Sequence, residues 1–465
     1  MKTIEYDLVV LGGGPAGYVA AIRGAQLGMR VACVDENPQF GGTCLRVGCI
    51  PSKALLESSH LYEEAKSGLS EHGIGLGEVT LDVASLMRRK EKIVDTLTGG
   101  IGQLFKKHKI DGYNGRGKLR DVDSVLVELS GGEAVLLRGK RTLLATGSRP
   151  AKMRGVEEDG VHIGNSSLAI AFDAVPEHFV VIGGGYIGLE LGSVWKRLGA
   201  KVTVLEAMDR LLPGMDGEIG KLAQRIYTRQ GLDFQFNSWV ESAKLEDGKC
   251  VVRCKDREPV TCDRVLVSTG RVPCSDSIGL EGVGIETDKR GFVPVDENFQ
   301  TPVANLYAIG DLIGGAMLAH KAMEEGIVCV ERMHGIASHV NYDVIPAIVY
   351  THPEIASVGK TEEQLVEAKV PFRKGVSPYG ANGRARTLGD VEGRVKILAH
   401  SETDRVLGVH IIGARAGDLI AEATAAMEFG ASSEDIARTC HAHPTLAEVV
   451  HEAALAVDGR AIHSA

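Results

Sequence analysis

The stretch "YDLVVLGGGPAGYVAAIRGAQLGMRVACVDEN", residues 6–37, decides the fold of the N-terminal part of the chain. It contains a β-branched apolar run, a glycine turn, a segment with small residues and a second apolar run. This order predicts a strand, a helix and a parallel strand, which form one βαβ unit. The pattern G-x-G-x-x-G falls on Gly12, Gly14 and Gly17, and the second apolar run ends at Asp35.

A second stretch, "HFVVIGGGYIGLELGSVWKRLGAKVTVLEA" at residues 178–207, has the same organisation, with Gly183, Gly185, Gly188 and Glu206 at the matching places. The first glycine permits the turn, the second lets a pyrophosphate approach, and the third allows close helix–strand packing. The acid accepts hydrogen bonds from a ribose diol and repels a 2′-phosphate. Two such units predict two dinucleotides, FAD at the first site and NAD rather than NADP at the second.

The chain has 465 residues, too many for one hydrophobic core. After Asn341 the sequence alternates like antiparallel strands, which predicts a third, α+β domain. We expect an α/β protein with two Rossmann-like domains and a C-terminal α+β dimerisation domain. The predicted ranges are 1–148 for FAD with the redox-active cysteines, 149–274 for NAD, 275–346 for a central domain and 347–465 for the interface.

The net charge of −9 argues against nucleic-acid binding. The start "MKTIEYDLVVLGGG" shows no signal-peptide pattern, and no apolar run is long enough to span a bilayer. These features predict a cytoplasmic protein that binds neither nucleic acid nor membrane.

Two cysteines lie close together in "GGTCLRVGCIPSK", residues 41–53. In a regular helix the Cα atoms of Cys44 and Cys49 would be about 8.7 Å apart, whereas a disulfide needs about 4.4–6.8 Å. If they pair, the helix must be distorted, and Gly41, Gly42, Gly48 and Pro51 supply the freedom and interruption. In a reducing compartment such a pair is more often catalytic or metal-binding than structural. The other cysteines occur singly and are expected to be small buried apolar residues: Cys33, Cys250, Cys254, Cys262, Cys274, Cys329 and Cys440.

Two further segments carry polar residues that suit a site. Asp311 follows an apolar strand, where it can bind a cofactor hydroxyl or cap a helix. In "HAHPTLAEVVHEA", residues 441–453, Glu448 lies five positions after His443. A histidine oriented by a carboxylate suits a general base, although the same residues also suit the start of a helix.

These motifs together identify a resemblance that covers essentially the whole chain. Its carriers are the two glycine fingerprints, "GGTCLRVGCIPSKALL", "AIGDLIGGAMLAHKAMEEG", "YTHPEIASVG" and "HAHPTLAE". The sequence resembles the FAD-dependent pyridine nucleotide–disulfide oxidoreductases, in particular the branch that oxidises dihydrolipoyl groups with NAD+. The resemblance implies a homodimer with active sites built from both subunits. It also implies lipoylated proteins and the core acyltransferase of a 2-oxo acid dehydrogenase complex as partners.

The resemblance implies a role for each catalytic residue. Cys44 is expected to exchange with the substrate sulfur, and Cys49 to be its disulfide partner nearer the flavin. His443 of the partner subunit is expected to be the base, held by Glu448. Lys53 is expected to lie beside the flavin and to pair with Glu190. No metal site is expected.

The resemblance also implies the cofactor contacts. Those for FAD are Gly12, Gly14, Gly17, Asp35, Gly42, Thr43, Lys53, Gly117, Thr146, Gly147, Ser148, Asp311, Met317, Leu318, Ala319 and His320. Those for NAD are Gly183, Gly185, Ile187, Gly188, Glu190, Glu206, Val240 and Gly270. Arg46 replaces an asparagine common in the family, and Asp35 replaces a glutamate.

Other functions fit the sequence less well. Glutathione-reductase-like enzymes usually carry basic residues after the second fingerprint, where this chain has Glu206-Ala207-Met208. A zinc-binding module needs two further nearby ligands, and no second closely spaced cysteine pair lies near Cys44 and Cys49 in the sequence. A mainly docking role in a multienzyme assembly is compatible with enzymatic activity.

Overall fold

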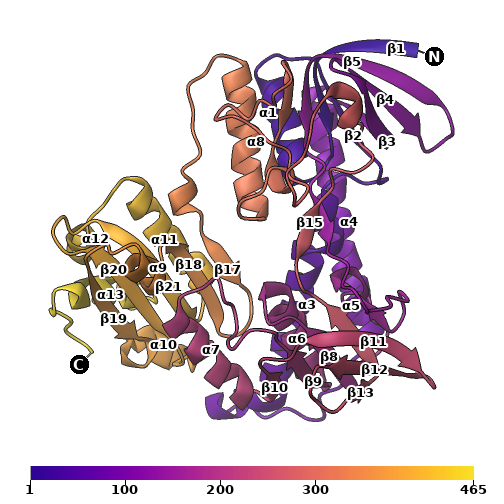
Figure 1. The fold of residues 1–465 in the computed structure, drawn as a ribbon. Helices are drawn as coiled ribbons and strands as arrows, with labels where there is room; N and C mark the ends of the chain where they lie inside the picture. Colours follow the sequence, from indigo (N-terminus) through magenta and orange to yellow (C-terminus); the bar gives the residue numbers. More distant parts are fainter. Residues whose placement is uncertain (1, 465) are drawn as a thin grey trace. The chain divides into compact units, whose positions relative to one another are not determined.

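The computed structural model describes residues 2–464, which form two compact units. Unit 1 contains the described residues up to 54 together with 84–152 and 269–340. Unit 2 contains residues 55–83, 153–268 and the described residues from 341 onward. Both units mix helices with parallel and antiparallel strands, so the predicted α/β class is confirmed (Figure 1). The division into four domains stays a prediction.

Unit 1 is built on a six-stranded sheet whose centre is parallel. Strands β1 and β2 pair in parallel, and β1 also pairs in parallel with β5. Strand β4 pairs antiparallel with the outer halves of β3 and β5. The bounds are β1 Lys2–Leu11, β2 Val31–Asp35, β3 Asp111–Asp121, β4 Ser124–Leu129, β5 Ala134–Leu144 and β16 Leu306–Ala308. Strands β6 (Ser148–Pro150) and β15 (Arg271–Pro273) form a separate antiparallel ribbon.

Helices α1 (Pro15–Gln26) and α8 (Ala319–Met333) pack against each other in unit 1. Small residues make this close approach possible: a side chain at Gly326 would lie 2.8 Å from the carbonyl oxygen of Ala16. Helices α2 (Gly42–Val47), α3 (Cys49–Glu63) and α4 (Val83–His108) follow β2 along the chain. Helix α1 therefore starts directly at the glycine turn after β1, as the βαβ pattern predicts.

Unit 2 contains a second parallel sheet, in the order β10-β9-β8-β14-β7. Its strands are β7 Ile163–Gly164, β8 His178–Ile182, β9 Lys201–Leu205, β10 Leu232–Gln235 and β14 Arg264–Val267. The helices of this part are α5 Ser166–Ala169, α6 Tyr186–Leu198 and α7 Gly217–Arg229. A small antiparallel sheet of β11 (Val240–Glu246), β12 (Lys249–Cys254) and β13 (Val260–Cys262) packs into the same apolar cluster.

The C-terminal part of unit 2 is an antiparallel sheet with helices, which confirms the predicted α+β texture. Its order is β17-β18-β21-β20-β19, and α13 packs on β19 and β20. The strands are β17 Ala347–Val349, β18 Glu354–Gly359, β19 Phe372–Pro378, β20 Arg394–His400 and β21 Val406–Gly413. The helices are α9 Glu362–Glu367, α10 Gly383–Leu388, α11 Ala416–Glu428, α12 Ser433–Arg438 and α13 Glu448–Val457. Within residues 2–464, no helix has the length and apolar character needed to cross a membrane.

Candidate functional site

The segment that carries Cys44 and Cys49 is a broken helix. Helix α2 ends at Val47, Gly48 leaves the helical region with φ −135° and ψ −108°, and α3 starts at Cys49. A side chain at Gly48 would lie 2.9 Å from the carbonyl oxygen of Thr43, so glycine is required there. The predicted distortion is therefore present. Pro51 does not contribute to it, because it lies within the first turn of α3, where proline is tolerated.

The break brings the two thiols together. Both cysteines are half-buried, unbridged thiols, and a side-chain hydrogen bond connects them. This hydrogen bond and burial raise the pKa of Cys44, whereas the nearby ammonium group of Lys53 acts in the opposite direction. The two sulfur atoms therefore lie within hydrogen-bond distance of each other.

Two glycine contacts fix the redox segment to the first fingerprint. The Gly41 N–H donates to the Gly13 carbonyl oxygen at 2.8 Å. A side chain at Gly42 would lie 2.5 Å from the Cα atom of Gly14. A ligand that binds at this turn therefore lies next to the segment that leads into Cys44.

The two fingerprint turns have the same geometry. The carboxylate of Asp35, at the end of β2, accepts from the Gly13 N–H at 2.7 Å. The carboxylate of Glu206, directly after β9, accepts from the Gly184 N–H at 2.6 Å. Each acid also accepts a hydrogen bond from the backbone N–H two residues further along the chain. Asp35 accepts from Asn37, and Glu206 accepts from Met208. Both acids are thus held at the turn, where a ribose would meet them.

The third glycine of each fingerprint is required by packing. A side chain at Gly17 would lie 1.7 Å from the carbonyl oxygen of Gly12, and one at Gly188 would lie 2.1 Å from that of Gly183. No side chain can be accommodated at these distances. By contrast, a Cβ atom added at Gly185 would meet no atom within 4 Å. These turns fit two dinucleotides, since they leave the pyrophosphate position open and keep the helix tight against the strand.

Unit 1 contains every residue predicted to contact FAD. The Ser148 hydroxyl donates to the Asp311 carboxylate, and the Thr146 hydroxyl donates to the carbonyl oxygen of Cys274 at 2.8 Å. A side chain at Gly117 would lie 2.3 Å from Leu11, so packing beside the fingerprint accounts for this glycine. Asp311 lies in a short 3-10 turn and caps no long helix, because α8 starts only at Ala319. Met317 and Leu318 precede α8, and His320 lies in its first turn.

The residues predicted to contact NAD lie in unit 2, except Gly270, which belongs to unit 1. Ile187 and Glu190 lie on α6, and Val240 starts β11. The buried carboxylate of Glu190 accepts from the Tyr350 N–H at 3.0 Å. The predicted pair of Lys53 with Glu190 would join the two units and stays a prediction.

His443 and Glu448 are brought together as predicted. The Nδ1 atom of His443 lies 2.9 Å from the Glu448 carboxylate, whose other oxygen accepts from the Thr445 N–H at 2.9 Å. Burial would raise the pKa of Glu448, but these two hydrogen bonds outweigh it and lower the pKa. The His443 side chain is 77% exposed in the single chain. The ring is therefore oriented by the carboxylate and remains free to reach another molecule.

Sequence reasoning missed a second ion pair in the same loop. The His441 ring lies 2.7 Å from the Glu422 carboxylate through Nε2 and 2.8 Å from the Thr439 carbonyl oxygen through Nδ1. Both partners can only accept, so both ring nitrogens carry protons and His441 is a cation. The hydrogen bond to Glu422 raises the pKa of His441. Glu422 lies on α11, 19 residues away, and no local spacing rule connects it with His441.

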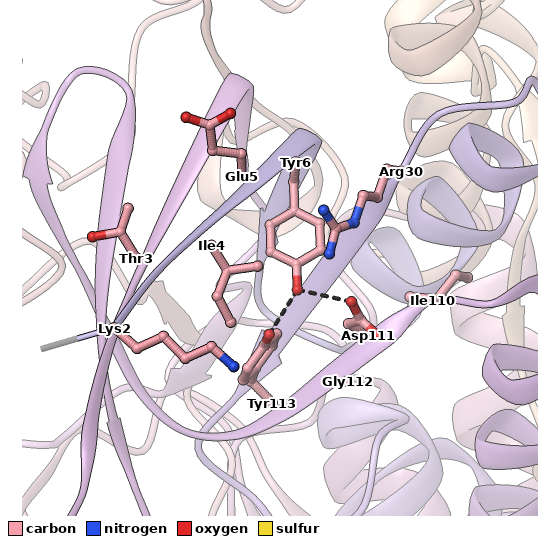
Figure 2. Close-up of a pocket in the computed structure, with 10 residues that line it drawn as sticks. All are labelled: Lys2, Thr3, Ile4, Glu5, Tyr6, Arg30, Ile110, Asp111, Gly112 and Tyr113. Atoms are coloured by element: carbon pink, nitrogen blue, oxygen red, sulfur yellow. Dashed lines mark hydrogen bonds between the residues drawn. The ribbon is translucent and has the colours of Figure 1, made fainter.

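An open hollow of about 680 Å³ lies at the amino ends of β1 and β3, away from the fingerprint turn that follows β1 (Figure 2). Tyr6 is at its centre, and its hydroxyl bonds to Asp111 at 2.8 Å and to Tyr113 at 2.6 Å. The Arg30 guanidinium lies 4.8 Å from the centre of the Tyr6 ring. These polar groups therefore satisfy one another. The residues that line the hollow include none of the fingerprint glycines and none of the redox segment 41–53.

Comparison with known families identifies the chain. Residues 6–326 match the pyridine nucleotide-disulphide oxidoreductases, and residues 345–454 match the dimerisation domain of that family. The chain belongs to this family. It therefore has the FAD- and NAD-dependent fold predicted above, and its dimerisation domain supports a homodimer.

Individual relatives agree along the whole chain. Dihydrolipoyl dehydrogenase, mitochondrial, from Pisum sativum is 48% identical over 99% of this chain and 93% of its own length. The protein of the same name from Mus musculus is 49% identical over 98% and 91%. Among solved structures, LpdA from Mycobacterium tuberculosis matches with a TM-score of 0.91 at 26% identity, covering 98% of this chain and 99% of its own.

These relatives contradict one prediction. The cytoplasmic location expected from the sequence is wrong, because the relatives from Pisum sativum, Dictyostelium discoideum and Mus musculus are named mitochondrial. The expectation relied on the lack of a secretory signal-peptide pattern, whereas mitochondrial targeting segments have a different, amphipathic and Arg-rich pattern. The lack of a secretory pattern therefore could not decide the location.

Proposed function

We propose that this chain is a dihydrolipoyl dehydrogenase, which oxidises a protein-bound dihydrolipoyl group and reduces NAD+ to NADH. The observation that carries the proposal is the contact of the Cys44 and Cys49 thiols at the Gly48 helix break. The glycine contacts fix this dithiol to the first fingerprint turn. The full-length likeness to enzymes of that name supports the choice of substrate.

Two cofactors fit the residues present. We infer that FAD is held at the first fingerprint by Gly12, Gly14, Asp35 and the Ser148–Asp311 pair, and NAD at the second by Gly183, Gly185 and Glu206. Glu206 favours NAD over NADP, because a 2′-phosphate would be placed against a buried carboxylate. When bound, the FAD ring system supplies the two-electron acceptor between the dithiol and the nicotinamide.

The two cysteines would accept electrons from the substrate by disulfide exchange. A substrate thiolate attacks the Cys44 sulfur of a Cys44–Cys49 disulfide, and Cys49 leaves as a thiolate. The second substrate thiolate then attacks the substrate sulfur of the mixed disulfide, the bond between that sulfur and Cys44 breaks, and Cys44 leaves as a thiolate. The cyclic disulfide product leaves, and two electrons remain on the cysteines. Lys53 would stabilise the thiolate charge, since its ammonium group already acts on Cys44 in this sense.

The protons would leave through His443 of the partner subunit. A neutral imidazole takes the substrate proton at Nε2, and Nδ1 keeps its hydrogen bond to the partner's Glu448. High exposure of the His443 ring in the single chain suits a role at the site of a second subunit. The dimerisation family match over residues 345–454 supports the same assembly.

The lipoyl substrate would come from a lipoylated protein. We infer that the enzyme works as the shared third component of 2-oxo acid dehydrogenase or glycine cleavage systems, and free dihydrolipoamide is the probe for this activity. A glutathione-reductase-like activity is the alternative, and it would require NADPH.

The test uses Cys44→Ser and Cys49→Ser in the full-length holoenzyme, with Cys254→Ser as the matched control because Cys254 lies on β12, outside the redox segment and outside the loop of His443. Both catalytic variants are expected to bind FAD and to oxidise NADH with ferricyanide, but to lose dihydrolipoamide turnover. Wild-type turnover in either variant would refute the proposal. Oxidation of NADPH by glutathione disulfide that exceeds dihydrolipoamide-dependent NADH formation would favour the alternative.

A further inference from the structure

Cys250 and Cys262 face each other in the small antiparallel sheet of unit 2. They lie on β12 and β13, and the strand register pairs them directly. Cα atoms of opposed residues in antiparallel strands are about 4.5–5.5 Å apart. This lies inside the range of about 4.4–6.8 Å that disulfides adopt. The backbone therefore already has the geometry of a cross-strand disulfide.

The side chains are also in contact. Both cysteines are buried, and a side-chain hydrogen bond connects their thiols. The Cys250 thiol also donates to the carbonyl oxygen of Asp263 at 3.6 Å. The contact between the two thiols lowers the pKa of Cys250 and raises that of Cys262, which suits Cys250 to the attacking role. Cys44 and Cys49 form the same kind of hydrogen-bonded pair in unit 1.

We propose that Cys250 and Cys262 form a second dithiol, separate from the catalytic pair, that hydroperoxides oxidise to a cross-strand disulfide. The sequence suggested isolated buried cysteines here, and the strand register corrects that interpretation. Cys254 lies on the same strand but is opposite Val240, so it has no thiol across the ladder. The pairing is therefore specific to positions 250 and 262.

The oxidation is balanced with one hydroperoxide. The Cys250 thiolate attacks the peroxide oxygen, the O–O bond breaks, and the leaving oxygen takes a proton, which gives water from hydrogen peroxide. Cys250 is then a sulfenic acid. The Cys262 sulfur attacks the Cys250 sulfur, the S–S bond forms, and the S–O bond breaks with loss of a second water. The two thiols lose two electrons and two protons, and the peroxide gains them.

Access to the pair requires local opening of the small sheet, because both thiols are buried. Strand β13 has three residues and is the outer strand in the order β11-β12-β13. A short edge strand opens locally at a much lower free energy than the core of the sheet. The cysteines belong to the apolar cluster that includes Val180 and Ile182 of β8, which leads into the second fingerprint. Strand β13 contacts the amino end of β8, where the Asp263 N–H donates to the His178 carbonyl oxygen, so the disulfide would tie two strands together at the end of β8 opposite the fingerprint turn.

The test treats the full-length holoenzyme with hydrogen peroxide under native conditions, blocks free thiols and digests with trypsin without reductant. Cleavage after Lys249, Arg253, Arg257 and Arg264 releases residues 250–253 and 258–264 as separate peptides. We expect these two peptides to be joined by a bond that dithiothreitol reverses. The chain has nine cysteines. Total thiols in the denatured protein should fall from seven, with the catalytic pair oxidised, to five.

Two variants and two internal controls make the result decisive. Cys262→Ser should abolish the joined peptides, whereas Cys254→Ser, a change on the same strand, should keep them. Cys33 and Cys329, which are buried in unit 1, should stay reduced. The proposal is overturned if 250–253 and 258–264 stay separate while Cys44 and Cys49 oxidise. Joining that occurs only when Cys33 and Cys329 are also modified would also overturn it, since that pattern reports unfolding.

Discussion

Replacing Glu448 by Gln tests whether the Glu448 carboxylate supports proton transfer by His443. The substitution keeps the size of the side chain but removes the negative charge that faces Nδ1 of His443 at 2.9 Å. In the resting single chain the pair is exposed, so it stabilises the fold by at most about 1 kcal/mol. During proton transfer the ring becomes an imidazolium, and a hydrogen bond to a charged group contributes about 1.5–3 kcal/mol. Because about 1.4 kcal/mol corresponds to tenfold, kcat/KM for dihydrolipoamide should fall about 10- to 150-fold.

The pH dependence gives an independent readout of the same change. The working base is the neutral imidazole, so the acid limb of kcat/KM reports protonation of the base. The Glu448 carboxylate, 2.9 Å from Nδ1, stabilises the protonated ring by its negative charge. Glu448→Gln should therefore shift the acid limb to lower pH while the plateau falls.

A matched control lies one turn further along the same helix. Glu452 bonds to Nδ1 of His463 at 2.9 Å, which is the same kind of pair away from the proposed base. Glu452→Gln should leave kcat/KM within about threefold and the acid limb in place. Our assignment is wrong if Glu448→Gln behaves like this control, with an unchanged plateau and an unshifted acid limb.

Three further predictions concern cofactor retention, acid stability and the second ion pair. The Gly17→Ala variant should lose bound flavin, because the new methyl group would lie 1.7 Å from the Gly12 carbonyl oxygen. The measurement is visible absorbance per chain. The control variant Gly102→Ala should retain flavin, because its new methyl group would meet no atom within 4 Å. Asp216→Asn breaks a buried ion pair with Lys396 at 2.9 Å and should lower the free energy of unfolding by about 3 kcal/mol in denaturant titrations at pH 7. Burial opposes ionisation of Asp216, but the charges of His410 and Lys396 and the hydrogen bonds of the carboxylate lower its pKa. The ion pair therefore stabilises the fold above the unfolded-state pKa of about 4, and this stabilisation is lost as the pH falls through the lower pKa of the folded state. The Glu422→Gln variant should lower kcat for dihydrolipoamide, because the loop that carries the proposed base loses the ion pair between His441 and Glu422. NADH oxidation by ferricyanide should stay unchanged. An equal loss of rate in both assays would contradict this prediction.

Local patterns in the sequence were sufficient for the strand–turn–helix units and for the dithiol. The glycines of each fingerprint act on atoms within a few residues, as the contact between Gly17 and Gly12 shows. The Gly48 break likewise is what a pairing of Cys44 with Cys49 requires, because a regular helix would hold their Cα atoms about 8.7 Å apart. In these cases the physical cause lies inside the motif, so the motif is enough to predict the geometry.

Contacts that depend on register or on distant elements were not predictable in this way. Ser148 meets Asp311 across 163 positions, although Ser148 starts β6 and Asp311 follows β16, which belong to different sheets. Cys250 meets Cys262 only because the β12–β13 ladder has a particular register, and a shift by one residue would place them on opposite faces. Single-sequence periodicity marks a strand but does not choose its partner or its register.

The described units separate the two kinds of chemistry that the proposed reaction needs. The dithiol, with its hydrogen bond and its glycine contacts to the fingerprint, belongs to unit 1 and is held rigidly by backbone packing. The proposed proton acceptor belongs to unit 2, where one carboxylate orients an exposed ring. Electron transfer requires a fixed distance between sulfur and cofactor, whereas a base must meet a substrate that arrives and leaves. The proposed supply of the base by a second subunit would satisfy both demands, because the dithiol would keep its packing while the partner's imidazole would approach from outside. Dilution to monomers should therefore abolish dihydrolipoamide turnover before it abolishes NADH oxidation by ferricyanide.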